Sequence, residues 1–143
     1  MTNLLTSISI LIALLTWFFT HLSSQKNQKI SHTAQIIANL STCERLAESS
    51  FQLTRLINRS TKITFSEIDE GTERYVVDIL DYYEYLCDLY ERGVLDRQTI
   101  LTLRGKLMKK TYEACSDYIQ GTRDAQKRKV YSGFERFVKD LAF

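Results

Sequence analysis

The chain has 143 residues, a formal net charge of +2, no proline and only five glycines. The residues that usually interrupt β-rich or loop-rich folds are therefore nearly missing, and we expect helices throughout. The length leaves room for one small domain beside a membrane segment. The near-neutral charge is unlike the strongly basic balance typical of nucleic-acid-binding domains.

An apolar segment opens the chain. Residues 3–22 read NLLTSISILIALLTWFFTHL and contain no Asp, Glu, Lys or Arg. About 20 apolar residues suffice for one crossing of a bilayer, so we predict a transmembrane helix here. Lys26 and Lys29 follow it, and basic flanks stay in the cytoplasm, which places the N-terminus outside and residues 26–143 inside. A cleaved signal peptide would need basic residues before the apolar core, and none precede it.

Small or weakly polar residues recur along this helix at intervals of four, three, four, three and four, which puts them on one face. In lipid, such residues let helices approach closely and bond across the contact, so the face is a candidate helix interface or the wall of a lumen. The alternative is that their hydroxyls bond only to carbonyls of their own helix. The residues are Thr2, Thr6, Ser9, Ala13, Thr16 and Thr20.

Residues 23–29, SSQKNQK, form either a short linker or an exposed helical turn. Apolar residues then recur at helical spacing over residues 30–60. No Gly or Pro occurs before Gly71, so a single helix over residues 3–59, about 85 Å long, is one of two alternatives.

A second soluble helix is predicted from about Ser66 to Arg92. Thr64 and Glu67 have the spacing of a capping box at its start. Gly93 ends it, because glycine is the usual residue just past a helix C-terminus.

A third helix follows Asp96, which fits an N-cap, and ends near Gly121; a fourth starts at about Arg123. Each helix has one apolar face that must be buried against the others. We therefore predict an all-α fold in which residues 30–143 form a cytoplasmic antiparallel bundle of about four helices.

Charge is unevenly distributed in this domain. Residues 67–91 contain nine acids against Arg74, and residues 104–129 contain eight bases. Adjacent helices could complement each other, or neighbouring subunits could meet head to tail and build a ring. A basic run within the second segment could contact phosphates, lipid headgroups or another subunit, or form a solvated face; it comprises Arg123, Lys127, Arg128 and Lys129.

The sequence contains no recognisable catalytic constellation. The two histidines, His21 and His32, lie beside the apolar segment, and the glycines are scattered singly. Cys43, Cys87 and Cys115 form no CxxC pair, so neither a zinc site nor a disulfide framework is indicated. We expect no catalytic residue, no metal and no cofactor.

Residues 77–94, VDILDYYEYLCDLYERGV, together with later positions, resemble a bacterial and phage family of membrane-anchored helical proteins of unknown function. Asp81 stands where that family has Asn, and Tyr83 where it has Phe. The resemblance implies an N-terminal membrane helix, a cytoplasmic helical domain and no established catalytic residues. The matching positions are Leu80, Asp81, Tyr83, Glu84, Gly93, Asp96, Arg123 and Phe134.

In layout, the chain is also similar to the small pore-forming membrane accessory proteins of RNA-targeting CRISPR systems. Our leading hypothesis is a non-enzymatic, single-pass protein of the bacterial inner membrane that assembles with copies of itself into a ring or pore and acts in antiphage defence. The alternative is a monomeric or dimeric tether or adaptor that holds a soluble protein or a nucleic acid, such as RNA, at the bilayer. A third class is a nuclease or hydrolase without a recognisable motif.

Overall fold

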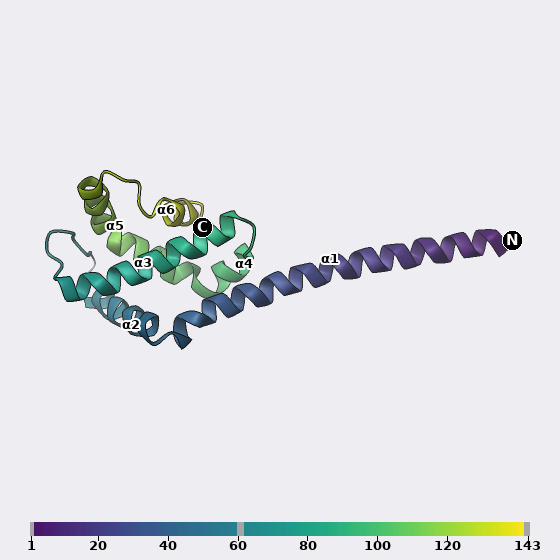
Figure 1. Cartoon of the computed structure of the whole chain (residues 1–143), viewed down its shortest axis with the longest axis horizontal. Coiled ribbons are helices and arrows are strands. Elements are labelled where there is room, and N and C mark those ends of the chain that lie inside the picture. The colour runs from purple at the N-terminus through teal and green to yellow at the C-terminus, as the bar shows by residue number, and fades with distance from the viewer. Residues whose placement is uncertain (1, 60–61, 142–143) are drawn as a thin grey trace.

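The computed structural model describes the backbone of residues 2–59 and 62–141, and the side chains from residue 8 onward within those ranges. It contains helices and no strand in that part of the chain, which confirms the all-α prediction. A long helix projects from a helical domain, as Figure 1 shows. The elements in chain order are α1 (Thr2–Thr42), α2 (Glu44–Arg59), α3 (Glu70–Glu91), α4 (Arg97–Ile100), the π-helical turn η1 (Leu101–Gly105), α5 (Lys106–Gln126) and α6 (Ser132–Lys139).

The long helix α1 has two parts. From Ile8 to Gln28 every side chain is exposed, whereas Thr33, Ile37 and Leu40 are buried in the domain. Residues 23–29 are helical and continue the rod without interruption. The predicted membrane helix therefore continues directly into the helical domain as part of one uninterrupted helix, α1.

A single 85 Å helix does not form. Helix α1 ends at Thr42, and at Cys43 the chain bends into α2, which continues away from the projecting half of α1 (Figure 1). Contacts made by α3 fix this turn: the Tyr82 hydroxyl donates to the Ile36 carbonyl at 3.1 Å, and the buried Asp78 carboxylate pairs with Arg45 of α2. Tertiary packing, rather than a Gly or Pro, sets the corner.

Helix α3 begins later than the sequence indicates. Its N-cap is Asp69, whose carboxylate accepts a hydrogen bond from the Thr72 N–H at 3.0 Å. The Thr64 hydroxyl and the Glu67 carboxylate do lie 3.3 Å apart, but in the preceding turn. The capping box predicted there is therefore wrong as a helix start. Gly93, with a φ of +74°, ends the helix as expected.

The third helix continues beyond Gly121 to Gln126, so Arg123 lies in α5 and not in the fourth helix. Gly121 sits inside the helix because Phe65 packs against it: a Cβ on Gly121 would lie 2.5 Å from the Phe65 Cβ. Lys127 and Tyr131, both with positive φ, then reverse the chain into the short α6.

Candidate functional site: the apolar helix and the α3–α5–α6 cleft

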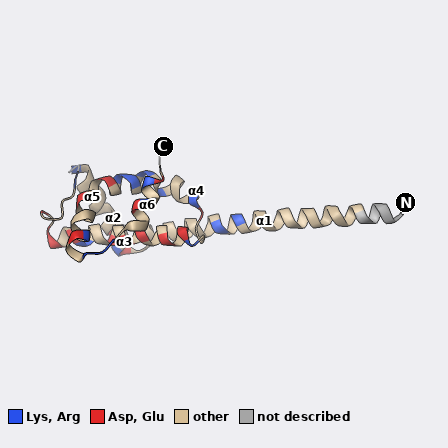
Figure 2. Cartoon of the chain, turned by 90° about the horizontal axis from the view of Figure 1, so that it is seen from above, with Lys and Arg blue, Asp and Glu red and all other residues tan. Residues whose placement is uncertain are grey.

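The outer part of α1 is the most unusual surface of the molecule. Among the described residues, Ile8–Thr42 is the one helix long and apolar enough to cross a membrane, and its most apolar stretch is not buried in the protein. Trp17 and Phe19 are each 65% exposed. Figure 2 shows this part of the helix without charged residues, while Lys, Arg, Asp and Glu cover the domain.

The predicted small-residue face of α1 is exposed at the positions whose side chains the structure describes. Ser9, Ala13, Thr16 and Thr20 are exposed, while the side chain of Thr6 falls outside the described residues. Thr16 donates to the Ile12 carbonyl and Thr20 to the Thr16 carbonyl, each at 2.8 Å. These two hydroxyls are thus satisfied within their own helix, and what the face offers a neighbour there is small size rather than free donors.

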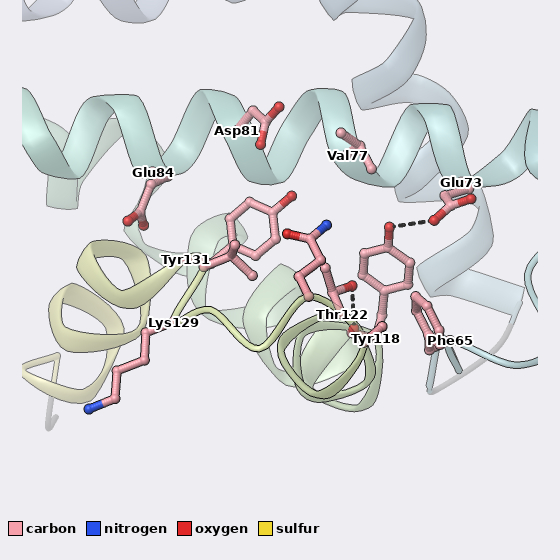
Figure 3. Close-up of a pocket in the computed structure, with 12 residues that line it drawn as sticks. Phe65, Glu73, Val77, Asp81, Glu84, Tyr118, Thr122, Lys129 and Tyr131 are labelled. Carbon is pink, nitrogen blue, oxygen red and sulfur yellow. Dashed lines mark hydrogen bonds between the residues drawn. The ribbon is translucent and has the colours of Figure 1, made fainter.

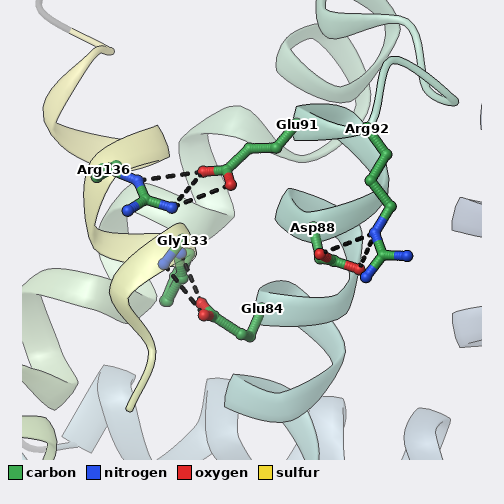
Figure 4. Close-up of polar contacts among 7 residues, drawn as sticks. Glu84, Asp88, Glu91, Arg92, Gly133 and Arg136 are labelled. Atoms are coloured by element: carbon green, nitrogen blue, oxygen red, sulfur yellow. Dashed lines mark hydrogen bonds and ion pairs between the residues drawn. The ribbon is translucent and has the colours of Figure 1, made fainter. Parts of the chain in front are cut away.

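Glu84, a motif residue on α3, caps a helix 49 residues later in the chain. Its carboxylate accepts the N–H groups of Gly133 at 3.0 Å and Phe134 at 2.7 Å, in the first turn of α6 (Figure 4). Tyr131, at the N-cap position itself, makes no side-chain capping bond. A carboxylate is favoured at this end of a helix because it meets free N–H groups and the positive pole of the dipole.

The apolar motif residues pack beneath this cap. Leu80, Tyr83 and Phe134 are almost fully buried. The Tyr83 and Phe134 rings lie 5.3 Å apart, and the Tyr112 ring of α5 meets Phe134 edge-on at 5.7 Å. These residues therefore hold α6 onto α3 and α5 and form a structural core.

The second part of the motif shapes the α3–α4 turn. Gly93 supplies the left-handed backbone, and Asp96 caps α4 by accepting the Thr99 N–H and hydroxyl at 2.8 and 2.7 Å. The Asp96 N–H donates to the buried Thr33 hydroxyl at 2.8 Å. The turn is thereby fastened to α1.

Arg123 is held by its own domain. Its Nε donates to the Val130 carbonyl at 2.9 Å, and its guanidinium lies 2.8 Å from the Glu135 carboxylate. Lys139 and Arg123 together lower the pKa of Glu135 to about 2. Arg123 thus stabilises the α5–α6 reversal.

Lys127, Arg128 and Lys129 are exposed beside Arg123 and line a shallow groove of about 520 Å³. Figure 1 shows the C-terminal end of α5 at the side of the domain remote from the projecting half of α1. The basic run therefore lies away from the projecting apolar half of α1.

An acidic cleft of about 620 Å³ opens between α3 and the α5–α6 segment (Figure 3). Glu73, Asp81 and Glu84 lie along one side, and the rings of Tyr118 and Tyr131 lie on the other. The Tyr118 hydroxyl donates to Glu73 at 2.8 Å, and burial with this carboxylate raises the pKa of Tyr118 to about 12. The Tyr118 phenol therefore stays protonated at neutral pH.

The described residues contain no group of three His, Cys, Asp or Glu side chains placed to hold a metal ion. Two acids of α3 pair with bases of distant segments: Asp78 pairs with Arg45, and Glu91 pairs with Arg136 at 2.7 Å (Figure 4). The sequence could not show these pairs, because their members lie 33 and 45 residues apart.

No curated protein and no solved structure matches the chain. A family model described as a domain of unknown function, DUF4760, matches residues 3–141, which includes both the apolar helix and the helical domain. The chain therefore belongs to the DUF4760 family.

Proposed function

We propose that this chain is a non-enzymatic, single-pass protein of the bacterial inner membrane, with residues 26–143 in the cytoplasm, that works by associating with copies of itself. The observation that carries the proposal is the division of α1. Its outer part exposes a continuous apolar surface, and its inner end is buried in the domain at Thr33, Ile37 and Leu40. An exposed apolar helix of this length favours burial in lipid.

Self-association is supported by the face containing Ser9, Ala13, Thr16 and Thr20. Lipid tails are as apolar as leucine, so membrane helices gain from close packing, which small residues allow. Because α1 enters the domain without a linker, contacts between membrane helices would also set how neighbouring domains meet. The subunits would thus form a ring or pore-like assembly.

The mass of the full chain in mild detergent, measured by native mass spectrometry, tests this proposal. We expect an oligomer, and we expect the triple change Ser9→Leu, Ala13→Leu and Thr16→Leu to shift it to monomer. The matched control, Leu11→Ala with Leu15→Ala, alters the opposite face and should leave the oligomer intact. A wild-type monomer would refute self-association.

We place the assembly in antiphage defence, as a membrane effector or accessory. Cells that express the full chain should then plate phage less efficiently than cells that express the triple-leucine variant at equal membrane levels. Equal plating of a panel of phages on both strains would refute the role in antiphage defence but would not affect the assignment to the membrane.

The alternative is a tether that holds a soluble protein or RNA through the groove at the far end of α5. This alternative is supported by the three exposed bases Lys127, Arg128 and Lys129, which follow the end of α5 that is remote from the projecting half of α1. Affinity purification with and without nuclease separates the two functions. A partner of fixed stoichiometry that is lost in Lys127→Glu with Arg128→Glu would support the tether.

A further inference from the structure

The contacts of α1 fix the height of the domain above a bilayer that contains the apolar segment, and this inference rests on the membrane anchoring proposed above. The apolar run ends at Leu22. At about 1.5 Å per residue, Lys26 lies about 6 Å and Ile30 about 12 Å beyond it. Headgroups occupy about 5–8 Å on each side of the hydrocarbon core, so Lys26 lies among them and Ile30 just above.

Helix α4 and the turn η1 lie beside this part of α1. Lys26 and Ile30 line one groove with Thr102 and Leu103, and the N–H of Asp96 bonds to Thr33 a little further along α1. Figure 1 shows α4 at the end of the domain from which α1 projects. Because α1 is a continuous helix through this contact, the turn cannot lie far from the bilayer surface.

The side chains exposed here suit a lipid interface. Leu103 is 49% exposed and Val94, in the turn before α4, is 39% exposed. Leu103 also lines a second groove of about 650 Å³ with Arg104 and Lys106. An exposed leucine flanked by bases is the combination that binds at the boundary of headgroups and acyl chains.

The acids at this end of the domain are already engaged. Asp96 accepts the Thr99 N–H, Asp88 pairs with Arg92 at 2.9 Å, and Glu91 pairs with Arg136. After the Thr99 hydrogen bonds, the charges of Lys29 and Lys26 also help to lower the pKa of Asp96, which places both lysines near this turn. Asp88 and Glu91 are paired with arginines, and Lys26, Lys29 and Lys106 outnumber the charged Asp96, so this end of the domain is net basic.

We propose that η1 and the turn before α4 rest on the membrane, with Leu103 at the lipid interface and Lys26 and Lys106 on anionic phospholipid headgroups. The domain then has a fixed orientation, in which the end of α5 with Lys127 and Arg128 faces away from the bilayer. Because this end of the domain would contact lipid, the oligomeric state of the protein would depend on the anionic lipid content of the membrane.

The test uses the full chain in phosphatidylcholine vesicles, with and without phosphatidylserine, that contain spin-labelled lipid as a shallow quencher. A Cys43→Ser background removes the exposed thiol, while Cys87 and Cys115 are buried. An NBD fluorophore is attached at Leu103→Cys or, as the matched control, at Phe51→Cys. Phe51 is 65% exposed on α2, beyond the end of α1 that is remote from the bilayer.

We expect the probe at position 103 to be quenched several-fold more than the probe at 51 when phosphatidylserine is present. Changing Lys106→Glu should reduce this difference, because each basic residue near an anionic surface contributes about fivefold to its partitioning. Hydrogen exchange of unlabelled protein provides a check without the probe: the amides of η1 should slow on anionic vesicles.

Trp17 is the only tryptophan of the chain and reports anchoring independently. If Trp17 is quenched and the probes at 103 and 51 are quenched equally, the membrane anchor stands and the contact of η1 with lipid is refuted. If Trp17 also escapes quenching by lipid that is spin-labelled deep in its acyl chain, α1 is not in the bilayer and both proposals fail.

Discussion

The Glu84 carboxylate on α3 accepts a 2.7 Å hydrogen bond from the backbone N–H of Phe134 in the first turn of α6. The last helix of the domain is thus capped by a residue from a distant helix. Tyr131, the N-cap residue of α6, contributes no side-chain cap of its own. The docking of α6 therefore depends on Glu84.

Changing Glu84→Ala should destabilise the domain by about 1–2 kcal/mol, the usual loss for a helix N-cap. Glu84→Gln keeps an acceptor oxygen and should cost less. Chemical denaturation measures both, and hydrogen exchange should show the Gly133 and Phe134 amides opening fastest in Glu84→Ala. Unchanged protection of these two amides would show that α6 does not need the cap.

The Asp78 carboxylate is buried and joins α3 to α2. It accepts hydrogen bonds from Arg45 Nε and from the Ser49 hydroxyl, each at 2.9 Å. The Arg45 hydrogen bonds come first among the causes that lower the pKa of Asp78 below its ordinary 3.8. The pair therefore stabilises the fold at neutral pH. Asp78→Ala should lower the free energy of unfolding by about 2 kcal/mol, because a charged hydrogen bond is lost; the loss is limited because Arg45 is exposed and water can solvate it.

The sign of the pH dependence follows from that lowered pKa. The stabilisation is fully present above the unfolded-state value near 3.8 and is lost as pH falls through the lower folded-state value. We expect the wild-type melting temperature to fall more steeply below pH 4 than that of Asp78→Asn, which carries no titrating group there. Parallel curves for the two proteins would contradict this assignment.

Gly105, at the end of η1, and Gly121, within α5, are a matched pair of positions for testing the effect of an added Cβ on stability. A Cβ on Gly105 would make an ordinary contact, 3.6 Å from Leu101, whereas one on Gly121 would lie 2.5 Å from the Phe65 Cβ. Gly105→Ala should therefore raise stability by up to about 1 kcal/mol. Gly121→Ala should lower it by about 1–3 kcal/mol, because the segment carrying Phe65 must move.

The Gly121 clash has a specific rescue, measurable by thermal unfolding. Phe65→Ala removes the Phe65 Cγ, which would lie 2.7 Å from the new Cβ, but keeps the Phe65 Cβ at 2.5 Å, so it should relieve the Gly121→Ala defect less than Phe65→Gly does. Equal effects of the two changes at Phe65 would show that the Gly121 contact is not made at the Phe65 Cβ.

The three cysteines should differ sharply in reactivity. Cys43 is exposed at the corner between α1 and α2, while Cys87 and Cys115 are buried. Burial raises the pKa of the Cys115 thiol to about 12 and also raises that of Cys87, so neither forms the reactive thiolate at neutral pH. A maleimide should add once to the folded chain and three times after denaturation, as counted by mass.

Local signals in the sequence predicted part of the fold well. Helices throughout, the end of α3 at Gly93 and the cap at Asp96 follow from residue types whose preferences act within a few positions, and the structure shows all three. Gly121 misled the prediction because its missing side chain serves the close approach of Phe65 rather than the end of a helix.

What the sequence could not predict depends on contacts between distant residues. The corner at Cys43 is set by α3 through Tyr82 and Asp78, and the role of Glu84 appears only when α6 is placed against α3. For the candidate site, the small-residue face of α1 was predictable from its spacing. The contact of η1 with α1 at Lys26 and Ile30 was not, because no local pattern links residues so far apart.

The central claim is that α1 anchors the helical domain in a bilayer, and extraction of cell membranes with alkaline carbonate tests it most directly. This treatment strips proteins bound only by charge and leaves those with a helix in the hydrocarbon core. Our account predicts that the full chain stays with the sedimented membranes and is released only by detergent. Recovery of the intact chain in the carbonate supernatant would contradict it.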